Sequence, residues 1–247
     1  MLYAIISDLH SNLEAVNAVL EYAEKLGVEK YICLGDVVGY NANPKEVLDI
    51  VRDLQPVAVI KGNHDEYVSQ EAELVGFNLQ AAQAVQWTRE QLSDNDRQWL
   101  AALPLIKNIY LLNTTLVHST LDSPESWGYI FDKYYAENSF SCQRLPYCFI
   151  GHSHVPFAYE QVGGMHGIIL AGRYQEIHLK PNHKYIINIG SVGQPRDGDP
   201  RASFASFDAD ENLVQLHRVA YDIHTTQRKI IAAGLPEKLA RRLEIGR

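Results

Sequence analysis

Short clusters of metal-binding residue types recur along this chain, and each cluster directly follows an apolar stretch that is typical of a β-strand. Because strand ends lead into loops, a rigid sheet can bring together side chains that are far apart in the sequence. The pattern therefore predicts an α/β fold with a two-metal centre on the loops at its strand ends. The clusters are Asp8-Leu9-His10, Gly35-Asp36-Val37-Val38-Gly39, Gly62-Asn63-His64-Asp65, His118 and Gly151-His152-Ser153-His154.

The composition is that of an ordinary globular protein, with 46% hydrophobic and 21% charged residues among 247. A net charge of −8 argues against a nucleic-acid-binding surface. It leaves room for a phosphorylated substrate, because bound divalent metals would dominate the local charge. Three cysteines without a Cys-x-x-Cys pair indicate a reducing compartment. The apolar stretch from Leu2 to Ile6 is too short for a signal peptide or a membrane span, so we expect a cytoplasmic protein without membrane contact.

The first part of the chain alternates between strand and helix patterns. Apolar strands are predicted at residues 3–6, 31–34 and 57–61, and helical spacing separates them at 12–26 and 44–54. Asn12 is the expected N-cap of the first helix and Gly27 its stop. This βαβαβ order predicts a mostly parallel sheet covered by helices. Residues 78–103 are expected to form two helices that separate near Ser93.

From residue 106 onward the pattern changes to strands separated by turn residues. It predicts a second, largely antiparallel or mixed sheet that packs on the first. We expect one domain, residues 1–247, with a helical tail at roughly 222–247. The predicted strands are 109–117, 147–150, 157–161, 167–170, 176–179, 185–189, 203–207 and 213–219.

The residue types suggest how the candidate ligands divide their tasks. A pair of divalent ions needs a bridging anion, and Asp36 is the natural bridge because it follows a central strand. Asp8 and His10 alternate along a segment that we expect to be extended, so both would point to the same side. Mixed carboxylate and imidazole ligation favours Mn, Fe, Zn, Co or Ni over Ca or Mg. The remaining candidate ligands are Asn63, His118, His152 and His154.

The motifs together resemble those of the calcineurin-like metallophosphoesterases, whose pattern is D-x-H, G-D-x-x-G/D, G-N-H-D/E, a later His and G-H-x-H. They cover residues 8–154, and the segment 188–198 looks like a loop of the small bacterial and archaeal phosphodiesterase branch. The resemblance implies a four-layer α-β-β-α sandwich, in which two packed mixed β-sheets are flanked by helices, and two divalent metal ions. One ion would be held by Asp8, His10, Asp36 and His154. The other would be held by Asp36, Asn63, His118 and His152.

The same resemblance implies catalytic roles. His64 would be a histidine that binds no metal and that contacts the phosphoryl group or protonates the leaving oxygen, and Asp65 would orient it. The nucleophile would be a hydroxide that bridges the metals and attacks phosphorus in line, so no covalent phospho-enzyme is needed. The implied activity is that of a metal-dependent phosphodiesterase or phosphatase on a small phosphorylated molecule, with a nucleotide as one candidate.

Three further residues are candidates for substrate contact. Arg196 either binds a phosphate or nucleotide moiety, or is solvated beside Asp197 and Asp199. Tyr40 and Asn41 either line the substrate pocket or simply form the loop after Gly39. The basic residues of the run 238–247 indicate a solvated helix face rather than a nucleic-acid site.

Two other classes remain as alternatives. A protein Ser/Thr phosphatase resembles this pattern, but such enzymes usually carry an arginine soon after the bridging aspartate, where this chain has Val37-Val38-Gly39. A non-catalytic scaffold of the same fold is disfavoured because every expected ligand is present. The sequence departs from the family at Ser119, where glycine is common, and at Asn41-Ala42-Asn43. It leaves open the substrate, the native metals, the preference for monoesters or diesters, and whether the chain is a monomer or a homo-oligomer.

Overall fold

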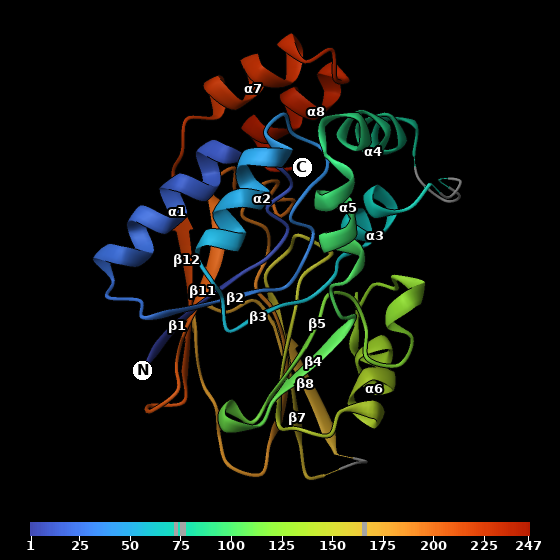
Figure 1. The fold of residues 1–247 in the computed structure, drawn as a ribbon. Helices are drawn as coiled ribbons and strands as arrows, with labels where there is room; N and C mark the ends of the chain where they lie inside the picture. The colour runs from blue at the N-terminus through green and yellow to red at the C-terminus, as the bar shows by residue number, and fades with distance from the viewer. Residues whose placement is uncertain (72–73, 75–77, 165–166) are drawn as a thin grey trace.

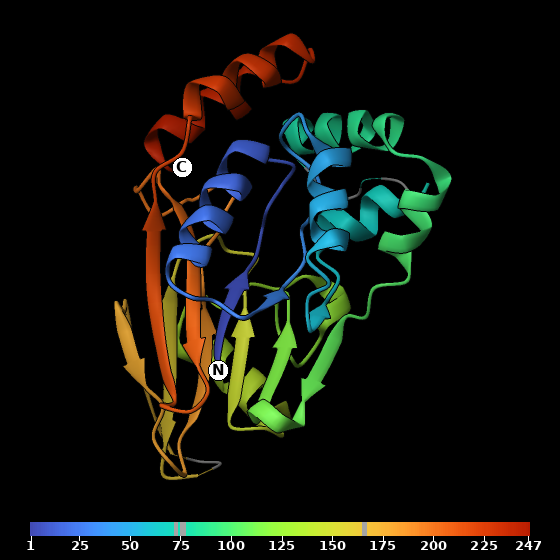
Figure 2. The ribbon, with the colours of Figure 1, turned by 60° about the vertical axis from the view of Figure 1, so that its left-hand side comes forward.

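The computed structural model describes residues 1–71, 74, 78–164 and 167–247. Two six-stranded mixed sheets pack face to face, and helices cover their outer faces (Figure 1 and Figure 2). The predicted four-layer α-β-β-α sandwich is therefore confirmed. In these residues no helix is long and apolar enough to cross a membrane.

The first sheet has the strand order β3-β2-β1-β11-β12-β9. Strand β1 pairs in parallel with β2 and antiparallel with β11, with Tyr3 opposite Phe207. The expectation that the later strands would all form a second sheet was therefore wrong for three of them. The reason is that β1 would otherwise present an unpaired edge, and β11 covers it. The strands are β1 (Leu2–Ile6), β2 (Lys30–Cys33), β3 (Ala58–Val59), β9 (Glu176–His178), β11 (Ala202–Asp208) and β12 (Leu213–Val219).

The second sheet has the order β4-β5-β6-β10-β7-β8. The single strand expected at residues 109–117 is instead two strands, because a 3₁₀ turn at Tyr110–Leu112 and Asn113, with φ of 51°, reverse the chain. Asparagine tolerates this left-handed conformation better than most residues do. The strands are β4 (Ile106–Ile109), β5 (Thr114–Val117), β6 (Tyr147–Ile150), β7 (Phe157–Val162), β8 (Ile168–Gly172) and β10 (Lys184–Asn188).

The alternation of strand side chains builds the separate cores of the sandwich. Tyr3 and Ile5 of β1 face the core between the two sheets, where Phe149 of β6 also lies. Ala4 and Ile6 point the other way, into the core under the outer helices. Since a shift by one residue would exchange these faces, the pairing of β1 is strongly specified.

The helix caps were predicted correctly from the sequence, but two of the helices were not predicted. Asn12 caps α1 and Ser93 caps α5, as predicted. The Gly-Asn-His-Asp cluster begins a helix, α3, that was not expected. Helix α6, which packs on the second sheet, was also missed. The helices are α1 (Leu13–Lys25), α2 (Pro44–Asp53), α3 (Asn63–Ser69), α4 (Leu79–Gln91), α5 (Asp94–Ala101), α6 (Lys133–Cys142), α7 (Ile223–Ala232) and α8 (Glu237–Arg241).

Candidate metal centre

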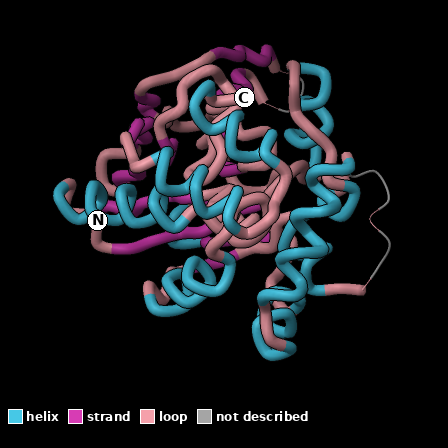
Figure 3. Tube along the Cα trace, turned by 90° about the horizontal axis from the view of Figure 1, so that it is seen from above, coloured by secondary structure: helices cyan, strands magenta, loops and turns pink. Residues whose placement is uncertain are grey.

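The predicted ligand clusters meet at one end of the sandwich. The cluster loops follow β1, β2, β5 and β6, and α3 begins just after β3. Figure 2 shows β1 pointing toward the end of the molecule where α7 lies, and Figure 3 views the molecule from that end, with loops in the middle and helices around them. The parallel pairing of β1 with β2, and of β5 with β6, brings these loops to a common edge.

Two groups of buried side chains share Asp36. The first contains Asp8, His10, Asp36 and His154, and the second contains Asp36, His118 and His152. In the first group Nε2 of His10 lies 3.5 Å from Oδ2 of Asp36, and Nε2 of His154 lies 3.2 Å from Oδ1 of Asp8. In the second group Nε2 of His118 lies 3.4 Å from Oδ2 of Asp36. The grouping matches the two sets that the resemblance implied, apart from Asn63, whose side chain is an amide.

Main-chain carbonyl groups fix the orientation of each imidazole. Nδ1 of His10 lies 3.1 Å from the carbonyl oxygen of Val38, and Nδ1 of His118 lies 2.7 Å from that of Leu34. His154 uses Nδ1 toward Gln194 at 2.6 Å, whereas His152 uses Nε2 toward Trp127 at 2.8 Å. A carbonyl oxygen only accepts, so in each ring this nitrogen carries the proton. Whenever such a ring is neutral, its other nitrogen carries a lone pair, as metal ligation requires.

These lone pairs fit a pair of cations. Nε2 of His10 and Nε2 of His154 lie 3.1 Å apart, an arrangement in which two lone pairs face each other. Within the described residues, the buried Nε2 of His118 and Oδ1 of Asn63 have no hydrogen-bond partner. Burial acts to lower the pKa of His118, but the carboxylates of Asp36 and Asp8 outweigh it and raise the pKa to about 9. The site is thus negative and rich in unused ligand atoms, which suits divalent metals of the transition series.

The backbone of the ligand loops differs from the expected extended geometry. Asp8 and His10 have φ of 52° and 46°, and His152 and His154 have φ of 67° and 60°. The prediction of an extended Asp-x-His segment was therefore wrong, although its side chains do meet. Backbone hydrogen bonds hold the first loop against that of Asp36, from Asp8 N to Gly35 O at 3.0 Å and from His10 N to Asp36 O at 2.9 Å. Left-handed residues of this kind are costly and persist where the surroundings enforce them.

His64 lies against the first ligand group. Its ring centroid is 4.8 Å from that of His10 and 4.3 Å from that of Tyr40, and its main-chain N–H donates to Oδ1 of Asp36 at 2.8 Å. Gly39, with φ of 97°, allows this approach, because a Cβ there would lie 2.5 Å from Nδ1 of His64. Burial lowers the pKa of His64 to about 4, so the ring is neutral near pH 7.

Asp65 links the start of α3 to the Asp36 loop. Its carboxylate accepts hydrogen bonds from the N–H groups of Val37 at 2.9 Å and Gly62 at 3.0 Å. Burial, followed by the nearby charge of Asp36, raises the pKa of Asp65 to about 7. These bonds fix the first turn of α3. His64, the residue before Asp65, lies in the same turn.

The three candidate substrate contacts lie in different surroundings. Asn41 is fully buried, and its Nδ2 donates to the carbonyl oxygen of His10 at 2.7 Å, so it supports a ligand loop. Tyr40 packs edge-on against His10 with ring centroids 4.6 Å apart. Arg196 is half-buried, lies over the Tyr40 ring at 5.5 Å, and donates from Nη2 to Oε1 of Gln194 at 2.8 Å.

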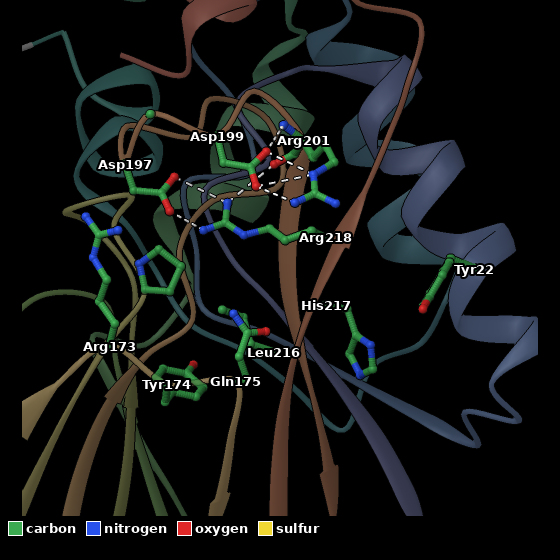
Figure 4. A pocket seen from close by; sticks show the side chains of 12 residues that line it. Tyr22, Arg173, Tyr174, Gln175, Asp197, Asp199, Arg201, Leu216, His217 and Arg218 are labelled. Atoms are coloured by element: carbon green, nitrogen blue, oxygen red, sulfur yellow. Dashed lines mark hydrogen bonds and ion pairs between the residues drawn. The ribbon is translucent and has the colours of Figure 1, made fainter.

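The aspartates near Arg196 pair with other arginines. Asp197 forms an ion pair with Arg218, and Asp199 pairs with Arg201 at 2.6 Å. Both pairs line a cavity of about 490 Å³ beside β12 (Figure 4). In the described part of the chain, no carboxylate lies within ion-pair distance of Arg196.

Several residues that shape the site were missed by sequence reasoning. Tyr129 stacks on His152 with ring centroids 4.1 Å apart, and Phe131 stacks on Tyr129 at 5.0 Å. Ser191 donates from Oγ to the carbonyl oxygen of Asp8 at 2.8 Å. Ser191 lies in the segment 188–198 whose likeness to the family was noted, whereas the aromatic pair follows no motif and could be found only from the fold.

Comparisons with known proteins agree with this geometry. The family model described as the calcineurin-like phosphoesterase superfamily domain matches residues 1–212. An uncharacterized protein of Methanocaldococcus jannaschii is 42% identical over 246 residues, which cover 99% of this chain and 98% of the relative. The crystal structure of a metallophosphoesterase from Sphaerobacter thermophilus is 39% identical, with a TM-score of 0.89 over 100% of this chain and 99% of that one. A hypothetical protein of Pyrococcus horikoshii, 21% identical, shares the fold with a TM-score of 0.80 over 100% of this chain and 98% of its own.

Proposed function

The chain belongs to the calcineurin-like phosphoesterase superfamily, and from this premise we propose that it is a metal-dependent phosphodiesterase acting on a small phosphorylated substrate, with nucleotides as the favoured class. The observation that carries the proposal is the pair of buried ligand groups that share Asp36 and lie beside the ring of His64. Such an arrangement has no structural necessity, since buried carboxylates and imidazoles without ligands are costly.

The residues of the chain divide the work in the proposed reaction. Asp8, His10, Asp36 and His154 would hold one divalent ion, and Asp36, Asn63, His118 and His152 would hold the other. Bound Mn, Fe, Zn, Co or Ni would supply Lewis-acid stabilisation of the phosphoryl group and activation of water. The neutral imidazole of His64 has one N–H, which it can donate to a phosphoryl or leaving oxygen. Asp65 keeps His64 in place through its bonds to the Asp36 loop.

The aromatic pair beside His152 favours an aromatic-bearing substrate. Tyr129 and Phe131 are 39% and 70% exposed, so they offer a ring surface to solvent next to the second ligand group. Stacking on such a surface is sequence-tolerant and stabilises a base by roughly 1–3 kcal/mol. A nucleoside attached to the reacting phosphate would use it, which is why nucleotides are favoured.

The alternative of a protein Ser/Thr phosphatase gains no support from the Asp36 loop. Val37 and Val38 are fully buried, and their N–H groups donate to Asp65. Neither position offers a cation to a phosphate.

The location that we propose is the cytoplasm, because Cys33, Cys142 and Cys148 are all free thiols.

A metal-reconstituted activity screen tests the proposal. The full chain is loaded with Mn, Ni, Co or Zn and assayed on a bis-aryl phosphodiester, an aryl phosphate, cyclic nucleotides and dinucleoside polyphosphates. We expect turnover on diesters that is lost in Asp36→Asn and kept in Asp49→Asn, a matched change at a partly exposed position on α2. Metal binding without turnover on any of these compounds would refute the proposed function and favour a scaffold.

A further inference from the structure

Among the four candidate imidazole ligands, His152 is oriented differently from the others. It donates through Nε2 to the main-chain carbonyl of Trp127 at 2.8 Å, whereas the other three use Nδ1. Its Nδ1 is therefore the atom that remains for a metal. With 5% of its surface accessible, it is also the most exposed of the four. The orientation of His152 thus depends on the segment that contains Trp127.

The segment 119–131, which we call the strap, joins the loop of His118 to α6 and contacts His152 twice. Trp127 provides the carbonyl acceptor, and the Tyr129 ring stacks on the imidazole with centroids 4.1 Å apart. The ring of Trp127 also lies 6.1 Å from that of His118, between centroids. The strap therefore touches both imidazoles of the second ligand group.

Trp127 holds a backbone conformation that a bulky residue seldom adopts. Its φ is 54°, and it ends the short 3₁₀ turn at Pro124–Ser126. Such a conformation is costly and persists where neighbouring contacts enforce it. Because strain of this kind is concentrated at functional sites, the contacts that hold Trp127 indicate what the strap does.

Ser119 supplies one of these contacts, at a position where the sequence departs from the family pattern. It is buried, and its Oγ donates to the carbonyl oxygen of Pro124 at 3.2 Å. The N–H of Trp127 donates to the same oxygen at 3.5 Å. A glycine at position 119 could not donate this bond. Because Ser119 directly follows His118, the shared carbonyl connects the two histidines of the second ligand group through the strap.

Ser139 on α6 holds the strap from another side. Its Oγ accepts from the N–H of Leu121 at 3.1 Å and donates to Oδ1 of Asp122 at 2.9 Å. Farther along, the hydroxyl of Tyr159 donates to the carbonyl oxygen of Ile130 at 3.2 Å. Side-chain hydroxyls thus hold the strap near both of its ends, so the loss of one of them should loosen the strap without unfolding the protein.

We propose that the strap positions His152 for metal binding, with the Trp127 carbonyl orienting the ring and Ser119 holding this carbonyl in place. The inference rests on the proposed function and deepens it, because it gives one of the two ligand groups its own support. A hydrogen-bond partner fixes the tautomer and orientation of a ligating histidine, and its loss typically weakens metal affinity about 10–100-fold. Ser119 acts one bond farther away, so its effect falls at the lower end of this range.

Ser119→Ala tests the proposal, because it removes one hydroxyl and adds no atom. In calorimetric titrations of the full chain with Mn, we expect one of two binding events to weaken about tenfold and the other to change by less than about twofold. Ser139→Ala should weaken the same event, since it loosens the strap from α6. Thr88→Val is the matched control and should change neither event: Thr88 is buried on α4, and its hydroxyl donates to the carbonyl oxygen of Ala84 at 2.7 Å.

The Nε2–H proton of His152 gives a second readout that needs neither metal nor turnover. In the full chain with isotope-labelled histidine, its NMR signal is assigned by its absence from His152→Asn. That variant should also lack the Mn binding event that Ser119→Ala weakens. We expect the proton to exchange with water about fivefold faster in Ser119→Ala than in the wild type, as a hydrogen bond that holds its acceptor is lost, and at the wild-type rate in Thr88→Val.

Equal weakening of both Mn binding events in Ser119→Ala would overturn the proposal, as would unchanged Mn binding or unchanged exchange of the His152 proton. The fate of the proposed function is separate. A chain that shows these effects of Ser119→Ala and hydrolyses no ester would keep the inference and lose the proposed function. An active enzyme in which Ser119→Ala changes neither readout would lose the inference alone.

Discussion

The proposed role of Asp36 as a shared ligand makes a sharp prediction about metal-linked stability. Asp36→Asn is nearly isosteric, and the amide oxygen can still accept the hydrogen bond from the N–H of His64. It removes a carboxylate from both ligand groups at once. His118→Asn, in contrast, removes a ligand from the second group alone.

The expected magnitudes follow from linkage. A ligand at one hundred times its Kd stabilises the folded state by about 2.7 kcal/mol per site, so two sites give roughly 5.4 kcal/mol. In a chain of this size each kcal/mol raises Tm by about 2–4 °C, which gives a wild-type shift of roughly 11–22 °C. His118→Asn should show about half of this shift, and Asp36→Asn should show little of it.

Differential scanning calorimetry with EDTA or with saturating Mn measures these shifts directly. Asp49→Asn serves as the control, because Asp49 is only partly buried on α2 and pairs with Lys45. It should keep the full metal-dependent shift. A full shift in Asp36→Asn would refute the bridging role, and equal losses in Asp36→Asn and His118→Asn would refute the division into two sites.

Three more predictions test other features of the molecule. Gly39→Ala should destabilise the fold by about 2 kcal/mol or more in urea unfolding and lower turnover, because the new Cβ would lie 2.5 Å from Nδ1 of His64 at a φ of 97°; an unchanged midpoint would contradict this. Burial acts to raise the pKa of Asp96, but hydrogen bonds from Ser93 and Arg52 outweigh it and lower the pKa. The unfolded chain thus binds more protons than the folded one, so this stabilisation is present above about pH 4 and is lost as pH falls below it; Asp96→Asn should remove that part of the acid sensitivity of the unfolding free energy. Tyr129→Leu should raise KM for a nucleotide diester by about tenfold and leave that of a methyl aryl diester within about twofold, the signature of lost base stacking in steady-state kinetics; equal effects on both would refute the stacking role.

The sequence alone located the clusters of candidate ligands because their signal is local. Each cluster follows an apolar run, and the strands before the loops of Asp8, Asp36 and His152 lie where those runs predicted them. Caps behaved in the same way, since Asn12 and Ser93 act through hydrogen bonds within their own first turns. The family and the sandwich fold followed from motif order and from the switch between helix and strand periods.

The pairing of the strands within each sheet could not be predicted from the sequence in this way. Alternation along β11 tells which faces are buried and says nothing about which strand lies alongside, so the pairing of Tyr3 with Phe207 came only from the fold. The left-handed backbone conformation of Asp8 and His10 could not be predicted from the sequence for a related reason. Contacts with the Asp36 loop, which is distant in sequence, enforce it.

The sequence by itself therefore determined the chemistry that the proposed centre can support, because residue type and local spacing decide which ligand atoms are available. Only the tertiary structure decided what surrounds that centre. Tyr129 belongs to no motif, and it reaches the edge of the centre because the 127–131 segment lies over His152. Substrate choice depends on such long-range packing, and local sequence patterns do not encode it.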